Sequence, residues 1–77
     1  MAAVPMNRTP MLRKHSLTIH GHATSLSLEP VFWQALHEAA AAEGKPLAAL
    51  VAEIDEARTT SLSSAIRVWL FERARRA

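Results

Sequence analysis

The chain has 77 residues, no cysteine and hydrophobic side chains at 49% of its positions. The absence of cysteine excludes disulfides and thiolate metal sites, and no apolar run reaches the roughly 18 residues of a membrane-spanning helix. The first ten residues also lack the apolar stretch of a secretory signal. We therefore expect one cytoplasmic domain without a membrane partner, stabilised as a homodimer because so short a chain buries little surface alone.

The net charge of +2 is unevenly distributed along the chain. Residues 1–28 carry three basic residues and no acid, residues 29–57 carry six acids and one lysine, and residues 58–77 carry five arginines and one glutamate. A basic front segment can meet phosphates, although basic character is also ordinary for a solvated chain end. We expect residues 1–12, with two prolines, to form a flexible arm, and residues 13–77 to form the domain.

Residues 17–28 alternate apolar and polar side chains, which predicts β-structure with one buried face. Leu17 and Ile19 occupy odd positions, whereas Leu26 and Leu28 occupy even positions. One regular strand cannot change parity in this way, because a slip of one residue turns every side chain to the opposite face. Gly21 lies between the two pairs and accommodates either a turn or a bulge. A short hairpin and two strand segments separated by a bulge both remain open.

From residue 30 onwards the apolar period becomes helical. Pro30 suits the first turn of a helix, and Phe32, Leu36, Ala39 and Ala40 then form a single stripe. Gly44 is expected to end this helix near residue 43 as a left-handed cap.

A second helix is predicted over residues 46–57, with Pro46 at its first position and Leu47, Leu50, Val51 and Ile54 as its stripe. Ser61 is a good N-cap for a third helix. The apolar surface of this third helix is wide, which again points to a partner chain.

The order of these elements resembles the ribbon-helix-helix family, in the subfamily with an additional C-terminal helix. The residues that carry the resemblance are Thr24-Ser25-Leu26-Ser27-Leu28-Glu29, Phe32-Trp33-Gln34-Ala35-Leu36, Gly44, Leu47-Ala48-Ala49-Leu50-Val51 and Leu62-Ser63-Ser64-Ala65-Ile66-Arg67. The resemblance implies a mostly α fold with a short N-terminal β ribbon, strands followed by three helices, in an intertwined homodimer. It also implies a DNA-binding transcriptional repressor whose two-stranded antiparallel ribbon enters the major groove of double-stranded DNA.

The resemblance also assigns roles to particular residues. The base-contact candidates are Ser25, Ser27 and the position of Ala23. The phosphate candidates are Arg13, Lys14, His15 and Lys45. The expected dimer core comprises Leu26, Leu28, Phe32, Leu36, Leu50, Val51, Ile54, Ile66, Trp69 and Leu70.

Two departures from the family pattern favour an alternative function. Ala23 cannot form a hydrogen bond with a base, and the second helix starts with Pro46 and Ala48 where Ser or Thr is frequent. The alternative is a protein-interaction module, antitoxin-like or a structural dimer, with a protein partner in place of specific DNA.

Other chemistry finds little support in the sequence. His20 and His22, with His15 nearby, are candidate metal ligands, but exposed turn histidines are the commoner explanation. Trp33 and Trp69 are expected in the core or the dimer interface. Because no phosphate loop, nucleophile elbow or helical metal motif is present, we expect neither an enzyme nor a cofactor.

Overall fold

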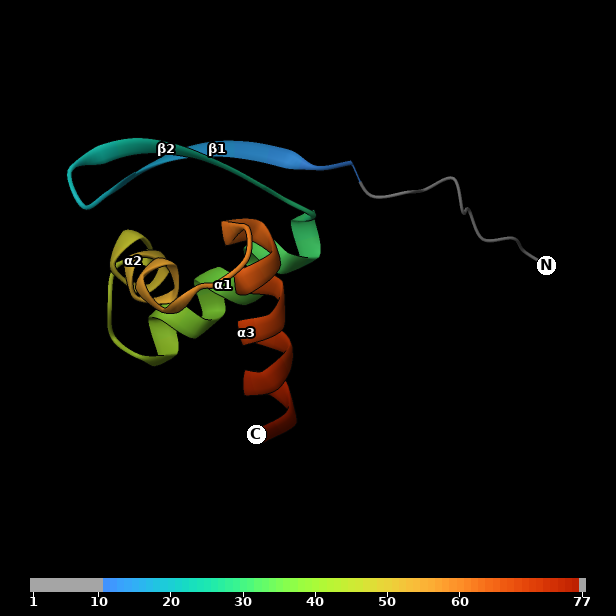
Figure 1. Ribbon diagram of the computed structural model, residues 1–77. Helices are drawn as coiled ribbons and strands as arrows, with labels where there is room; N and C mark the ends of the chain where they lie inside the picture. The colour runs from blue at the N-terminus through green and yellow to red at the C-terminus, as the bar shows by residue number, and fades with distance from the viewer. Residues whose placement is uncertain (1–10, 77) are drawn as a thin grey trace.

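A two-stranded antiparallel sheet followed by three helices makes up the chain, in a computed structural model that describes residues 11–76 (Figure 1). The elements are β1 (Arg13–Ile19), β2 (His22–Leu28), α1 (Pro30–Ala42), α2 (Leu47–Ala57) and α3 (Leu62–Arg76). This architecture confirms the predicted mostly α fold, in which a short N-terminal β ribbon is followed by three helices. The arm expected over residues 1–12 lies outside the described residues, except for Met11 and Leu12.

The two strands form a hairpin within one chain. β1 pairs with β2 from Arg13 opposite Leu28 to Ile19 opposite His22, so that only His20 and Gly21 connect the strands. Both turn residues have positive φ, 54° and 78°, as a two-residue type I′ turn requires. The hairpin explains the change of parity: each strand turns its own apolar pair towards the helices. Residues 17–22 therefore pair within the chain.

Local signals define the helix ends much as the sequence predicts. Gly44 has φ 67°, and the amides of Gly44 and Lys45 donate to the carbonyls of Ala41 and Ala40, which is the Schellman arrangement. The Ser61 hydroxyl accepts a hydrogen bond from the Ser64 amide at 3.3 Å. Pro46 differs by one position from the prediction, since it is the N-cap of α2 and helical geometry starts at Leu47.

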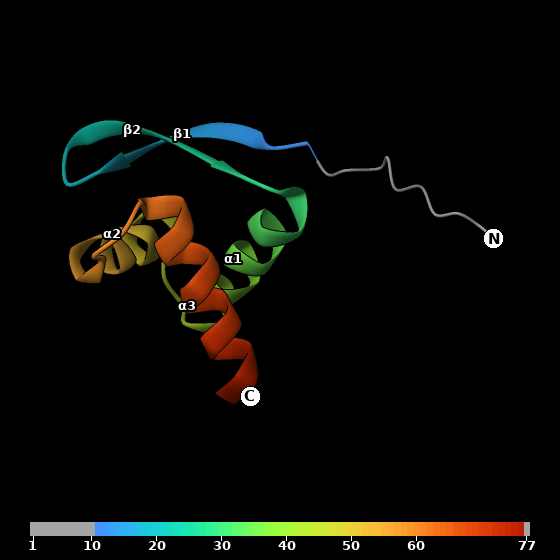
Figure 2. The same ribbon diagram turned by 45° about the vertical axis from the view of Figure 1, so that its right-hand side comes forward.

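The ribbon lies across one side of the three helices, and α3 runs away from it towards the C-terminus (Figures 1 and 2). Eight of the ten residues expected in the dimer core are buried inside the single chain, and Phe32 and Trp69 are partly buried against them. Leu28, Leu36, Val51 and Ile66 are 0% exposed. One chain thus covers the side chains that we expected a dimer to cover.

Among the described residues, no helix is both long enough and apolar enough to cross a membrane.

Candidate nucleic-acid interface

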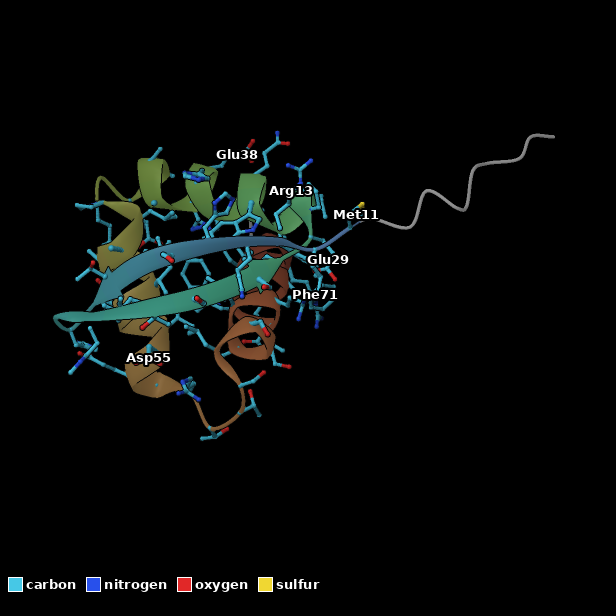
Figure 3. The ribbon with its side chains drawn as sticks, turned by 90° about the horizontal axis from the view of Figure 1, so that it is seen from above. Met11, Arg13, Glu29, Glu38, Asp55 and Phe71 are labelled. Atoms are coloured by element: carbon cyan, nitrogen blue, oxygen red, sulfur yellow. The ribbon has the colours of Figure 1, made fainter. Side chains whose placement is uncertain are left out.

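The outer face of the ribbon carries a row of small polar side chains. Directly opposed residues of an antiparallel pair share a face of the ribbon. The face that carries Leu17 and Ile19 of β1, and Leu26 and Leu28 of β2, packs on the helices. The alternate rows therefore face away from the helices, towards the viewer in Figure 3. They consist of three opposed pairs: Lys14 with Ser27, Ser16 with Ser25, and Thr18 with Ala23.

The chemistry of this outer face suits a surface of phosphates and base edges. Four of its six side chains carry hydroxyls, which both donate and accept hydrogen bonds. It carries no carboxylate, and within residues 11–76 the Lys14 ammonium takes part in no ion pair. The predicted base-contact residues Ser25, Ser27 and Ala23 thus lie together on one face, joined by Ser16 and Thr18. Sequence reasoning missed these two because their partners across the hairpin were undecided.

Arg13 and His15 belong to the opposite row of β1, on the helix side. The Trp33 indole Nε1 donates a hydrogen bond to the Arg13 carbonyl at 2.9 Å. The His15 ring meets the Trp33 ring edge-on, with centroids 4.6 Å apart. Both residues remain exposed at the end of the ribbon. Of the three neighbouring basic candidates, only Lys14 projects from the outer face.

Lys45, the fourth phosphate candidate, lies in the connection between α1 and α2 and is engaged by two carboxylates. Its Nζ lies 2.6 Å from Glu53 Oε2 and 3.4 Å from Glu43 Oε1. The hydrogen bond to Glu53, assisted by Glu43, raises the pKa of the Lys45 ammonium above its ordinary value. Lys45 therefore keeps its positive charge, but the carboxylates of Glu43 and Glu53 compensate it. For this reason Lys45 contributes little to a phosphate-binding surface.

The histidines flank the ribbon without forming a cluster. His20 Nε2 lies 3.6 Å from Glu56 Oε2, and His22 is exposed beside the turn. In residues 11–76 no three His, Cys, Asp or Glu side chains come together in a group that could hold a metal ion. Trp33 lies in the core and is 6% exposed. Trp69 belongs to α3 and is partly buried beside the end of α2.

Comparison with known protein families matches the model of the ribbon-helix-helix domain over residues 12–74, a span that includes both strands and almost all of α3. The chain belongs to the ribbon-helix-helix family. Proteins of this family are generally DNA-binding regulators or antitoxins, typically form dimers, and use a fold that is regulatory rather than enzymatic. No curated protein and no solved structure was found to match the chain.

An ion pair holds the ribbon end of this ribbon-helix-helix domain against its third helix. Glu29 follows the last residue of β2 and is the N-cap of α1. Its Oε1 lies 2.9 Å from Arg67 Nε and 2.8 Å from Arg67 Nη2. A hydrogen bond from its own backbone N–H, followed by that from Arg67, lowers the pKa of the Glu29 carboxyl. These partners are 38 residues apart, so no local sequence pattern predicts their contact.

We expect Arg67→Met to lower the melting temperature at neutral pH, and the loss to shrink as the solution is acidified. In the folded chain the pKa of the Glu29 carboxyl is lowered from its ordinary value of 4.5. The stabilisation by the ionised carboxylate is therefore fully present above pH 4.5, and it is lost as the pH falls through the lowered pKa of the folded state. Thermal unfolding followed by circular dichroism at about pH 7 and about pH 3 measures the difference. Arg76→Met, at an exposed position, is the matched control, and an equal loss at both pH values would contradict the role of Glu29.

Proposed function

We propose that this chain is a DNA-binding transcriptional regulator, a cytoplasmic repressor acting as a homodimer, and that the outer face of its ribbon enters the major groove of double-stranded DNA. The single observation that carries the proposal is the composition of that face: hydroxyls and one unmatched ammonium with no carboxylate. Family membership supports the same conclusion.

The dimensions and chemistry of the ribbon fit the groove. The major groove of B-DNA, about 12 Å wide, admits a two-stranded β ribbon. Hydroxyls of Ser16, Ser25 and Ser27 can exchange hydrogen bonds with base edges, while Lys14 attracts a phosphate. Because a single hydroxyl cannot make the bidentate contacts of Arg or Asn, and Ala23 offers apolar contact alone, we expect modest base discrimination and a large electrostatic share of the affinity.

We expect Lys14→Ala to weaken binding to all duplexes. The number of counterions released on binding, which sets the salt dependence of the affinity, should fall by about one per ribbon. The loss follows from removing a cation that faces the phosphates. Fluorescence anisotropy titrations of the full chain against a mixed-sequence duplex, at several salt concentrations, measure both quantities.

Lys45→Ala is the matched control. It removes the same positive charge, but from a site where two carboxylates already compensate it. It should leave the salt dependence nearly unchanged. If both variants lost affinity equally, net charge rather than the outer face would account for binding. If the wild-type chain bound no duplex even at low salt, DNA binding would be excluded.

A second candidate function is an antitoxin-like or structural protein-interaction module. It is favoured by an exposed apolar groove between α1 and α3, lined by side chains that include Val31, Val68 and Phe71. Purification of the chain with one stoichiometric protein partner and no retained DNA would support this candidate over the first.

A further inference from the structure

We infer that the groove between α1 and α3 binds a free α-amino acid with an apolar side chain. The groove has a volume of about 540 Å³, within the range of about 300–1,000 Å³ that is usual for small-molecule sites. Its apolar lining includes Val31, Phe32 and Ala35 of α1 and Val68, Leu70 and Phe71 of α3. An apolar lining with a few polar groups is typical of such sites.

The exposed apolar side chains of the chain gather at this groove. Residues 11–76 expose five large hydrophobic side chains, and three of them, Val31, Val68 and Phe71, line the groove at 65%, 55% and 62% exposure. Viewed from above, Phe71 lies at the end of the molecule where Glu29 lies (Figure 3). Scattered exposed hydrophobics need no explanation, whereas several around one groove indicate a binding site. The groove therefore offers cover for an apolar group of a ligand.

The charged side chains of the groove indicate what else the ligand carries. Arg67, Glu72 and Arg75 line the groove, and Arg67 is already paired with Glu29 at 2.8 Å. Within residues 11–76 neither Glu72 nor Arg75 takes part in an ion pair. Arg75 Cζ lies 5.8 Å from the centroid of the Phe71 ring, a cation–π contact that keeps the guanidinium at the groove. One carboxylate and one guanidinium thus lack a partner of opposite charge.

A small zwitterion complements both of these groups at once. Residues three apart are neighbours on a helix surface, with Cβ atoms about 5–6 Å apart, and Glu72 and Arg75 have this spacing. An α-amino acid carries its carboxylate and ammonium on the same carbon. The carboxylate accepts hydrogen bonds from Arg75, and the ammonium donates to Glu72. An apolar carboxylate without the ammonium would satisfy Arg75 alone, and an apolar amine would satisfy Glu72 alone.

Titration of the full chain with L-phenylalanine, followed by amide proton–nitrogen NMR correlation spectra without DNA, tests the site. We expect saturable shifts with a dissociation constant on the order of 1 mM, because exposed ion pairs contribute little each. The amide resonances of Val68 and Phe71 should move. Those of Lys14 and Ala49, which do not line the groove, should stay in place.

Two analogues of the ligand separate the contributions of its charges. 3-Phenylpropionate lacks the ammonium, and 2-phenylethylamine lacks the carboxylate. Each should bind about three- to fivefold more weakly than phenylalanine, the value of one exposed ion pair. Equal affinity of phenylalanine and either analogue would contradict recognition of the zwitterion.

Variants of the two charged residues should respond to the analogues in a crossed pattern. Arg75→Gln should weaken phenylalanine and 3-phenylpropionate about three- to fivefold and leave 2-phenylethylamine unchanged. Glu72→Gln should weaken phenylalanine and 2-phenylethylamine and leave 3-phenylpropionate unchanged. Both side chains are exposed, so the fold should be retained. Arg76→Gln, at an exposed position that does not line the groove, is the control and should change none of the three affinities.

The absence of saturable shifts at about ten times the expected dissociation constant would overturn the proposal. Equal effects of both variants on all three ligands would also overturn it, because they would indicate altered packing and not charge recognition. A second copy of the chain over the groove would make the Val68 and Phe71 resonances depend on protein concentration without ligand, and would exclude the amino acid. Since no DNA is present, failure of this test leaves the proposed function standing, and a chain that binds phenylalanine but no duplex refutes the proposed function alone.

Discussion

Leu36→Ala is expected to lower the free energy of unfolding by about 3–5 kcal/mol, the range for truncating a fully buried leucine. Leu36 is 0% exposed and belongs to the core cluster formed by the ribbon and all three helices. A domain of this length has a total stability of about 4–12 kcal/mol at ordinary values per residue. The substitution should therefore remove a large share of the stability, which urea unfolding followed by circular dichroism at fixed protein concentration measures.

Leu12→Ala is the control for this change, because it truncates the same side chain where it is 56% exposed. Its effect should stay within about 0.5 kcal/mol. Equal losses for the two variants would show that the core around Leu36 is not closed as described.

Ser25→Glu is expected to reduce the affinity for duplex DNA at least about 100-fold while leaving the fold intact. It places a carboxylate at the centre of the outer face, where repulsion from phosphates and loss of solvation both oppose docking. Ser25 is exposed and lies opposite Ser16, so the longer side chain meets no core atom. Anisotropy titration at low salt measures the loss, and circular dichroism checks the helix content.

The control Ala41→Glu changes the net charge equally from an exposed position on α1. It should weaken binding only slightly through long-range repulsion. Should Ser25→Glu bind DNA as well as the wild type, the outer face would not be the docking surface. The protein-interaction candidate would then become the stronger one.

Short-range patterns account for most of the secondary structure that the sequence predicts correctly. Helix ends depend on residues within one turn: Pro30 at a start, Gly44 with its positive φ at an end, and Ser61 as a cap. The outward position of Ser25 and Ser27 follows from the period of two along β2. The same period could not decide between a hairpin and a bulge, because both accommodate the change of parity around Gly21.

By itself, the sequence determined the elements, their order, the family and the hydroxyl-rich face of β2, since each depends on residues close together in the chain. Only the tertiary structure decided that one chain closes its own core and that Lys14 faces outward while Lys45 is paired with carboxylates. It also decided that three of the exposed apolar side chains line one groove between α1 and α3. These features depend on contacts between distant segments, such as Trp33 with Arg13 and Arg67 with Glu29. Side-chain period specifies which face of an element is buried, but not which other segment covers that face.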